Sequence, residues 1–199
     1  MKKSPPSSRK PPVTKYFFVS PEKEHADTTA LSKQISESEW FVQKNRERGR
    51  RARDGSLVIV NCSPDYSSKV SMVLSHALSP QNNDIPLPLY HLQMPYPNST
   101  AADLKECKAS SFELFMKLSL LNEPKIIFVD AGVLRGVNFT VLRADAVRAF
   151  PEKDVAFACL YVQRNSVFKP DFFVEEFDFE TQGGLMFHWE NPKNPLWNY

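Results

Sequence analysis

Apolar residues recur along the chain in two patterns that predict helices and buried strands in turn. Where they lie three or four positions apart, the spacing predicts an amphipathic helix; a short continuous run predicts a buried strand. The helical spacing covers residues 21–41, 67–78, 99–121 and 139–150. The apolar runs cover residues 57–60, 125–129 and 154–162. In the first helix the predicted buried face holds Ala26, Ala30, Leu31 and Ile35.

Strands that alternate with helices predict an α/β fold, in which a mostly parallel sheet is covered by helices on both faces. The segment Ile85–Met94 alternates in polarity, but Pro86 and Pro88 confine it to a sheet edge because proline donates no backbone hydrogen bond. The last segment of the chain is irregular and ends with Leu185–Glu190.

Ligands of open parallel sheets bind beyond the carboxyl ends of the strands. In this sequence those ends are followed by Cys62–Ser67, Asp130–Asn138 and Gln163–Phe168. We therefore expect these segments to surround one crevice.

The segment Phe128–Thr140, "FVDAGVLRGVNFT", has the outline of a phosphate-binding loop. An apolar strand ends on the carboxylate of Asp130, and Gly132 and Gly136 follow before a helix begins. Such a loop directs backbone N–H groups at an anion beside a helix N-terminus. Arg135 adds a guanidinium that is suited to phosphate or carboxylate, although a surface arginine paired with a neighbouring acid is an equal alternative.

The order of these elements and the closing segment resemble purine phosphoribosyltransferases of the xanthine/hypoxanthine type. The resemblance covers about residues 15–190 and is most specific near the end of the chain. There the motifs Pro170-Asp171-Phe172-Phe173, Glu175-Glu176 and Trp189-Glu190 follow one another as in that family. It implies a phosphoribosyltransferase-type twisted, mostly parallel sheet flanked by helices, with a small C-terminal hood.

The resemblance also implies a site. In an active member, paired acids after the strand bind the ribose hydroxyls and a third acid stabilises charge near the reacting nitrogen. The loop holds the 5'-phosphate, and a second loop holds the diphosphate of 5-phosphoribosyl-1-diphosphate with Mg²⁺. By this resemblance the ligand loop consists of Asp130, Arg135, Gly136, Asn138 and Thr140. The base pocket consists of Gln163, Arg164, Phe173 and Trp189.

Several positions depart from the family pattern in the loop itself. Asp130 matches the first ribose acid, but Ala131 stands in place of the second. Leu134 replaces the third acid, and Arg135 replaces a small hydroxyl residue. No catalytic residue is therefore assigned, and Asp130 is the single retained ribose-type acid.

Departures continue outside the loop. The diphosphate loop is "CSPDYSS", in which Pro64 donates no N–H and Asp65 repels a diphosphate. Gln163 stands in place of the lysine that addresses the purine, and Gly184 in place of the tryptophan that stacks on it. Because every part of the chemistry is altered, we interpret the chain as a phosphoribosyltransferase-like protein with degraded catalytic motifs, a nucleotide/anion-binding or protein-interaction module.

Two other functions stay open at this stage. One is an active purine phosphoribosyltransferase (a glycosyltransferase of nucleotide salvage), which would need Mg²⁺ and 5-phosphoribosyl-1-diphosphate. The other is an RNA- or ribonucleoprotein-associated protein, because Lys44–Arg53, "KNRERGRRAR", is a basic run suited to phosphates. A solvated helix end is the simpler interpretation of that run.

Composition limits the domain organisation, the partners and the cellular compartment that are compatible with the sequence. The 199 residues suit a tail, 1–14, rich in Pro, Ser and Lys, followed by a single domain over 15–199. A net charge of +2 does not by itself indicate nucleic acid or membrane as a partner. Unpaired cysteines, with no apolar leader or membrane-length run, predict a cytoplasmic protein, with nuclear or organellar placement left open. No metal ligand set is evident, and a homodimer is a further alternative.

Overall fold

A computed structural model describes residues 15–42, 57–79, 86–92, 94 and 101–188. Three of the sequence-based predictions fall on other parts of the chain. They concern the tail 1–14, the basic run Lys44–Arg53 and the base-pocket residue Trp189, which lie outside the described residues.

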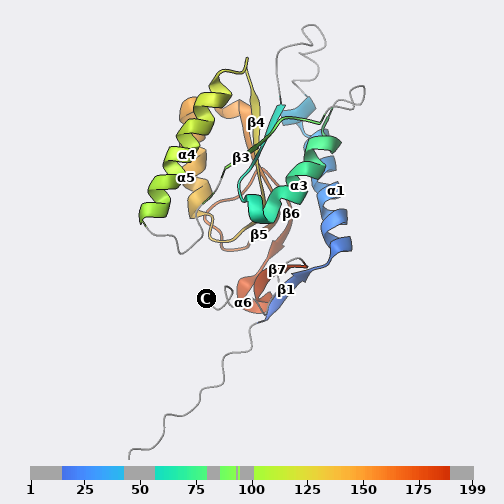
Figure 1. The fold of residues 1–199 in the computed structure, drawn as a ribbon. Helices are drawn as coiled ribbons and strands as arrows, with labels where there is room; N and C mark the ends of the chain where they lie inside the picture. The colour runs from blue at the N-terminus through green and yellow to red at the C-terminus, as the bar shows by residue number, and fades with distance from the viewer. Residues whose placement is uncertain (1–14, 43–56, 80–85, 93, 95–100, 189–199) are drawn as a thin grey trace, which may run out of the picture.

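The centre of the fold is a five-stranded sheet in the order β3-β2-β4-β5-β6, and every neighbouring pair runs parallel (Figure 1). The strands are β2 (Leu57–Asn61), β3 (Leu89–His91), β4 (Lys125–Val133), β5 (Val155–Gln163) and β6 (Phe172–Phe177). The residues of β2, β4 and β5 are almost all buried, as expected for parallel strands covered on both faces. β3 lies at the edge, which confirms the prediction made from Pro86 and Pro88.

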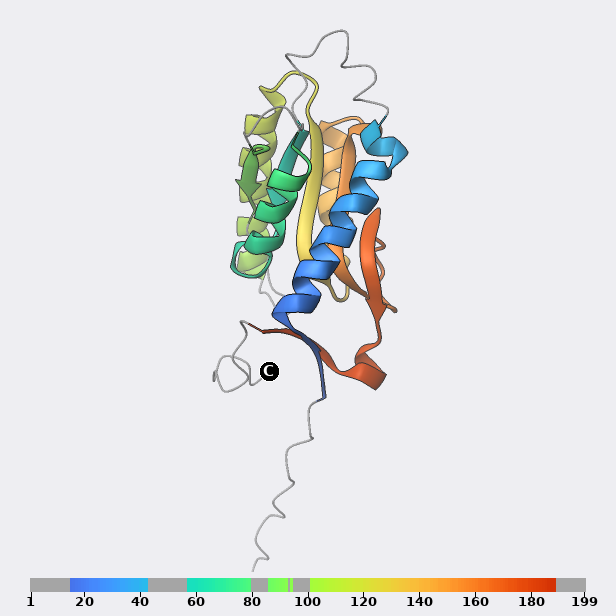
Figure 2. The same cartoon turned by 90° about the vertical axis from the view of Figure 1, so that its right-hand side faces the viewer.

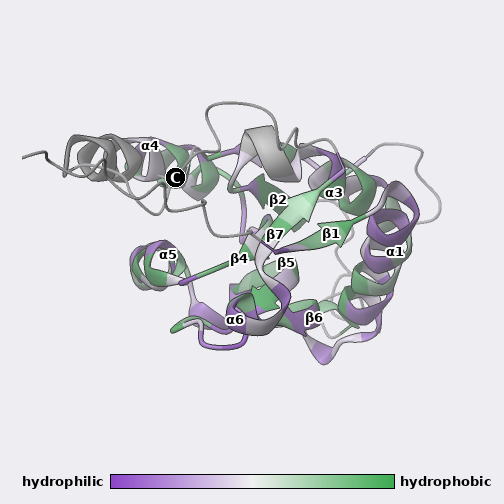
Figure 3. Cartoon of the chain, turned by 90° about the horizontal axis from the view of Figure 1, so that it is seen from below, coloured by the Kyte–Doolittle hydropathy of each residue, from purple (hydrophilic) through white to green (hydrophobic). Residues whose placement is uncertain are grey.

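Helices cover both faces of this sheet, with α1 and α3 on one side and α4 and α5 on the other (Figure 3). Their bounds are α1 (Pro21–Glu37), α3 (Pro64–Ala77), α4 (Ala101–Ser119) and α5 (Val137–Ala149). The short helix η1 (Glu152–Asp154) leads into β5. None of the described helices is long and apolar enough to cross a membrane.

Each face of the sheet has its own apolar core. On the α4 and α5 side, Phe115, Phe128, Phe139 and Phe157 pack in edge-to-face and stacked contacts with ring centroids 4.9 to 6.3 Å apart. On the α1 and α3 side the core is mainly aliphatic. The division predicted from the sequence, a parallel sheet between two helical layers, is confirmed.

A second, two-stranded sheet forms a hood beyond the carboxyl ends of the central strands (Figure 2). β1 (Tyr16–Val19) pairs in parallel with β7 (Gly184–Phe187), and the short helix α6 (Phe179–Gln182) lies between β6 and β7. The predicted hood is therefore present. It is built from both ends of the domain and not from the C-terminal segment alone.

Three details of the predictions were wrong. The strand through Asp130 does not end there, because Gly132 and Val133 continue to pair with β5. The closing segment is not irregular but forms β6, α6 and β7. The first helix buries Glu24 and Thr28 with Leu31 and Ile35, while the predicted Ala26 and Ala30 are exposed.

Candidate functional site

The carboxyl ends of β2, β4 and β5 bring together the predicted ligand segments. The hydroxyl of Ser63, after β2, donates to Asp130 Oδ2 in β4 at 2.8 Å. The N–H of Val167, after β5, donates to the carbonyl of Arg135 at 3.1 Å. These bonds link the three segments at the carboxyl ends of the strands, and the crevice expected between them stays a prediction.

Asp130 is held inside the sheet. Its backbone pairs with Cys159 of β5, and the residue is only 6% exposed. Burial raises the pKa of its carboxyl to about 6, although hydrogen bonds from the Ser63 hydroxyl and from the N–H groups of Ala131 and Gly132 act to lower it. The Ala131 N–H donates to Oδ1 at 2.7 Å, so both carboxylate oxygens have protein partners.

The segment expected to bind a diphosphate is part of a polar network around Asn61. Asn61, at the end of β2, accepts a short hydrogen bond from the Ser67 hydroxyl and donates to Ser68 Oγ at 3.1 Å. Its Nδ2 also lies 3.3 Å from Nδ1 of His91 in β3. Sequence analysis did not select Asn61 or His91. The signal for Asn61 was a polar residue directly after the apolar run 57–60.

Ser63 connects this network to β4. It stands immediately before α3, at the position where a serine normally bonds to the first turn of the helix, yet its side chain makes no such cap. Its hydroxyl is directed to Asp130, and its carbonyl accepts from the Ser67 hydroxyl at 2.9 Å. Ser63 therefore joins the residues around Asn61 to Asp130.

The hood covers the last residues of β4. A Cβ placed on Gly132 would lie 2.5 Å from Cδ2 of Leu185 in β7, so the leucine rests directly on the glycine. Leu134 and Leu185 are both partly buried against the apolar core of the α1 and α3 side. The end of β4 under the hood is therefore lined by aliphatic side chains.

The loop after β4 turns into α5 at Gly136. This residue has φ = 77°, a left-handed conformation that favours glycine, and a Cβ there would meet Ser166 Oγ at 2.4 Å and the Phe168 N atom at 2.8 Å. The first helical bond of α5 runs from the Thr140 N–H to the Gly136 carbonyl at 3.0 Å. The Thr140 hydroxyl donates to the same carbonyl at 3.1 Å.

Arg135 and Asn138 flank that turn. The Arg135 side chain is exposed, and among the described residues its guanidinium makes no ion pair. Asn138 is half-buried. Within the described part of the chain, the ion pair with a neighbouring acid that was the alternative for Arg135 is therefore not formed.

Residues predicted for the base pocket lie in two places. Gln163 ends β5 opposite Phe177, and the Arg164 guanidinium lies 3.6 Å from Asp178, so both are at the carboxyl edge. Phe173 pairs with Cys159 further back along the sheet and packs against the core of the α4 and α5 side. The structure does not bring Phe173 to Gln163 and Arg164.

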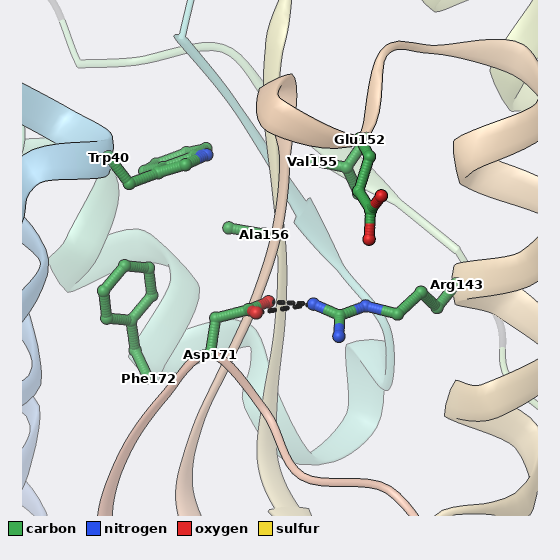
Figure 4. Close-up of a pocket in the computed structure, with 7 residues that line it drawn as sticks. All are labelled: Trp40, Arg143, Glu152, Val155, Ala156, Asp171 and Phe172. Atoms are coloured by element: carbon green, nitrogen blue, oxygen red, sulfur yellow. Dashed lines mark hydrogen bonds and ion pairs between the residues drawn. The ribbon is translucent and has the colours of Figure 1, made fainter. Parts of the chain in front are cut away.

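Asp171 of the Pro-Asp-aromatic-aromatic motif lies at the opposite, amino end of the sheet. It accepts from the Phe157 N–H at 2.8 Å and from Arg143 of α5, which ties the start of β6 to β5 and α5. These side chains border a cavity of about 250 Å³ (Figure 4). Its lining consists of Trp40, Arg143, Glu152, Val155, Ala156, Asp171 and Phe172.

The chemistry available at the carboxyl edge is limited. Burial, together with the charge of Asp130, raises the pKa of the Cys159 thiol, so this thiol is neutral and not a nucleophile. No group of His, Cys, Asp and Glu side chains in the described residues is arranged to hold a metal ion. Among the described residues, the edge presents a buried carboxylate, a polar network around Asn61 and the exposed guanidinium of Arg135 beside a helix N-terminus.

The fold is that of purine phosphoribosyltransferases. The structure is similar to a purine phosphoribosyltransferase from Pyrococcus horikoshii with a TM-score of 0.55 and 16% identity, over 88% of this chain and 95% of that one. It is similar to the xanthine-guanine-hypoxanthine phosphoribosyltransferase of Helicobacter pylori with a TM-score of 0.52 and 15% identity, over 88% and 93% of the two chains.

A third similar structure is a hypothetical protein from Neisseria gonorrhoeae with bound ppGpp. Its TM-score is 0.56 at 13% identity, over 91% of this chain and 92% of that one. At such identities the likeness concerns the fold. No protein-family model and no curated protein matches the sequence.

Proposed function

We propose that this protein uses the phosphoribosyltransferase fold to bind an anionic ligand, a nucleotide or another phosphate compound, and that it does not transfer a phosphoribosyl group. The observation that supports the proposal is the environment of Asp130, the single ribose-type acid, whose two carboxylate oxygens accept hydrogen bonds from the Ser63 hydroxyl and the Ala131 N–H inside the protein. Catalysis of this transfer requires positioned charge around the sugar and the departing diphosphate. Leu134 and Leu185 supply none.

The residues at the edge do not fit Mg²⁺ with 5-phosphoribosyl-1-diphosphate. Both oxygens of Asp130 accept hydrogen bonds from Ser63 and Ala131. Ala131, at the position of the second ribose acid, is 1% exposed and part of an apolar core. Mg²⁺ with a diphosphate is bound through one or two accessible carboxylates together with the phosphates. Asp130 is a buried carboxylate and Ala131 offers none, so no step of a transfer reaction is assigned to these residues.

Anion binding is assigned to the turn from Arg135 to Thr140. Gly136 allows the chain to enter α5 with no side-chain cap, and the first N–H groups of a helix carry partial positive charge. Arg135 adds a full charge at the same end. The similar fold from Neisseria gonorrhoeae was solved with the nucleotide ppGpp, which is consistent with nucleotide binding on this scaffold.

Two measurements test the proposal. Hypoxanthine, xanthine or guanine incubated with 5-phosphoribosyl-1-diphosphate and Mg²⁺ should give no nucleotide. Phosphate, sulfate and nucleoside monophosphates at millimolar concentration should raise the melting temperature at moderate salt, because a ligand that binds the native state stabilises it. Nucleotide formation by the wild type would establish the alternative, an active transferase.

The anion site is tested by Arg135→Ala, which should weaken the thermal shift. The matched control is Arg148→Ala, because Arg148 lies at the other end of α5, pairs with Asp145 and is also exposed. Equal effects of the two variants would show that general positive charge, and not this turn, binds the anion. If no anion stabilises the wild type, the protein acts as an interaction scaffold only.

A further inference from the structure

α4 carries large apolar side chains on two opposite sides, whereas a helix on the surface of a domain normally has one apolar face. Its inner side packs against the sheet through Leu114, Phe115 and Leu118, all at most 8% exposed. On its outer side Phe112 is 68% exposed and Met116 is 53% exposed.

The exposed residues form a continuous line. Phe112, Met116 and Leu120 are spaced by four residues, which places them one above another on a helix. Leu120 follows the last residue of α4, but its N–H bonds to the carbonyl of Lys117 at 3.3 Å, so the helical turn extends to it. With Leu120 84% exposed, these three residues, called here the outer row, are an uncovered apolar stripe and not scattered single side chains.

Charges of both signs border the outer row. Glu113 and Lys117 each follow a member of the row by one position, and they pair with each other along the helix at 2.7 Å. The pair lies along one flank of the row, with the acid and the base one helical turn apart. A partner that presents the same two charges in the reverse direction brings each of them next to its opposite.

We propose that the outer row of α4 is the contact surface for a second copy of this chain. In an antiparallel pairing about a two-fold axis near Met116, Phe112 of one copy faces Leu120 of the other, and the two Met116 side chains meet. The same symmetry brings Glu113 of each copy towards Lys117 of the other, because every contact of a two-fold interface occurs twice.

The surface suits a dimer in exchange with the monomer. α4 has 19 residues and is about 28 Å long, so one helix pair buries less area than a permanent dimer requires. α4 also lies on a face of the sheet and not at the carboxyl edge under the hood (Figure 1). Assembly through this surface is therefore independent of the proposed anion site.

Sedimentation velocity over a dilution series tests the proposal. The wild type should move from the 22.8 kDa monomer to twice that mass as concentration rises. Met116→Glu should shift the midpoint to at least tenfold higher concentration, because it places two carboxylates at the axis. Met72→Glu is the matched control, since Met72 on α3 is 55% exposed and lies outside the row; it should leave the midpoint unchanged.

Charge reversal identifies the partner as a second copy. Glu113→Lys alone should weaken the dimer, because it opposes two lysines across the axis. Combining it with Lys117→Glu should restore the dimer, since the reversed pair is again self-complementary. Melting temperatures near that of the wild type confirm that each variant is folded. A monomer at every concentration, a dimer unaffected by Met116→Glu, or a double reversal that does not recover would each overturn the proposal.

Discussion

The Ser63 hydroxyl donates to Asp130 Oδ2 at 2.8 Å, across 67 positions of the chain. This bond joins the segment after β2 to the middle of β4 and uses the side chain that would otherwise cap α3. With the bond from the Ala131 N–H, it gives both carboxylate oxygens partners inside the protein. Asp130 is thereby part of the packing of the sheet.

Asp130 should make stability depend on pH in the acid range. Burial raises its pKa to about 6 in the folded protein, from 3.8, so the folded state binds the proton more tightly. Its contribution favours folding below about pH 4 and is lost as the pH rises towards 6. The carboxylate therefore costs about 3 kcal/mol at neutral pH. Asp130→Asn should remove this pH step and raise the free energy of unfolding at pH 7 by about 1–3 kcal/mol, measured by urea titration at several pH values.

A second variant tests whether Asp130 causes this change in the free energy of unfolding with pH. Ser63→Ala removes a hydrogen bond that lowers the pKa of Asp130, so the step should extend to higher pH. In the background of Asp130→Asn, Ser63→Ala should have no effect on the pH profile. A step that persists without the carboxylate would assign it to another group.

The contact between Gly132 and Leu185 predicts that substitutions at the two residues have non-additive effects on the free energy of unfolding. Gly132→Ala should push Leu185 aside and cost about 1 kcal/mol. Leu185→Ala should cost about 1–2 kcal/mol, since the leucine is only partly buried. Together they should cost at least about 0.5 kcal/mol less than the sum, because the small residue at 185 leaves room for the added methyl.

A pair of distant residues serves as the control for this double-mutant cycle. Gly132→Ala combined with Leu120→Ala should give the simple sum, because Leu120 is 84% exposed beyond the end of α4. Additive costs for Gly132 and Leu185 would mean that the hood does not rest on the strand. The end of β4 would then be open to a ligand.

The central sheet could be predicted from the sequence because its strands are buried on both faces. The apolar runs of β2, β4 and β5 need no knowledge of the rest of the fold. β1 and β7 could not be predicted in this way, since they are four residues long and partly exposed, and they pair only with each other from opposite ends of the domain.

The site was harder to predict because its contacts depend on strand register. Asp130 follows an apolar run, which favours a strand end. The pairings of Gly132 with Tyr161 and of Val133 with Val162 show that the strand continues. The hydrogen bond from Ser63 to Asp130 also depends on this register, because the register decides to which face of the sheet the carboxylate points. Arg135 and Gly136, in contrast, could be placed at a helix start from sequence alone, because glycine and the following helical spacing are local signals.

The buried face of α1 is a further point at which sequence and structure differ, and it can be tested. Alanine is apolar, so Ala26 and Ala30 were selected, but Glu24 is buried instead, where it pairs with Lys69 at 3.0 Å. Ala26→Lys and Ala30→Lys should change the free energy of unfolding by less than about 0.5 kcal/mol. Thr28→Lys should cost at least about 2 kcal/mol, because Thr28 is 2% exposed. If denaturant titrations gave similar costs for the alanine variants and for Thr28→Lys, α1 would have to present a different face to the sheet.

The last prediction concerns the turn at Gly136. Here φ is 77°, and a Cβ would lie 2.6 Å from Phe168 Cβ and 2.8 Å from the Phe168 N atom. Gly136→Ala should therefore cost about 2–4 kcal/mol, of which the left-handed conformation accounts for about 1–2. Adding Ser166→Gly should recover little, because the backbone of Phe168 remains in the way.

Gly184→Ala is the control. A Cβ there meets its nearest atoms at 3.7 Å, so this variant should cost less than about 1 kcal/mol. Equal losses in the two variants, measured by urea unfolding, would show that the loop after β5 does not hold the start of α5, and the anion site proposed at Arg135 would lose its fixed backbone.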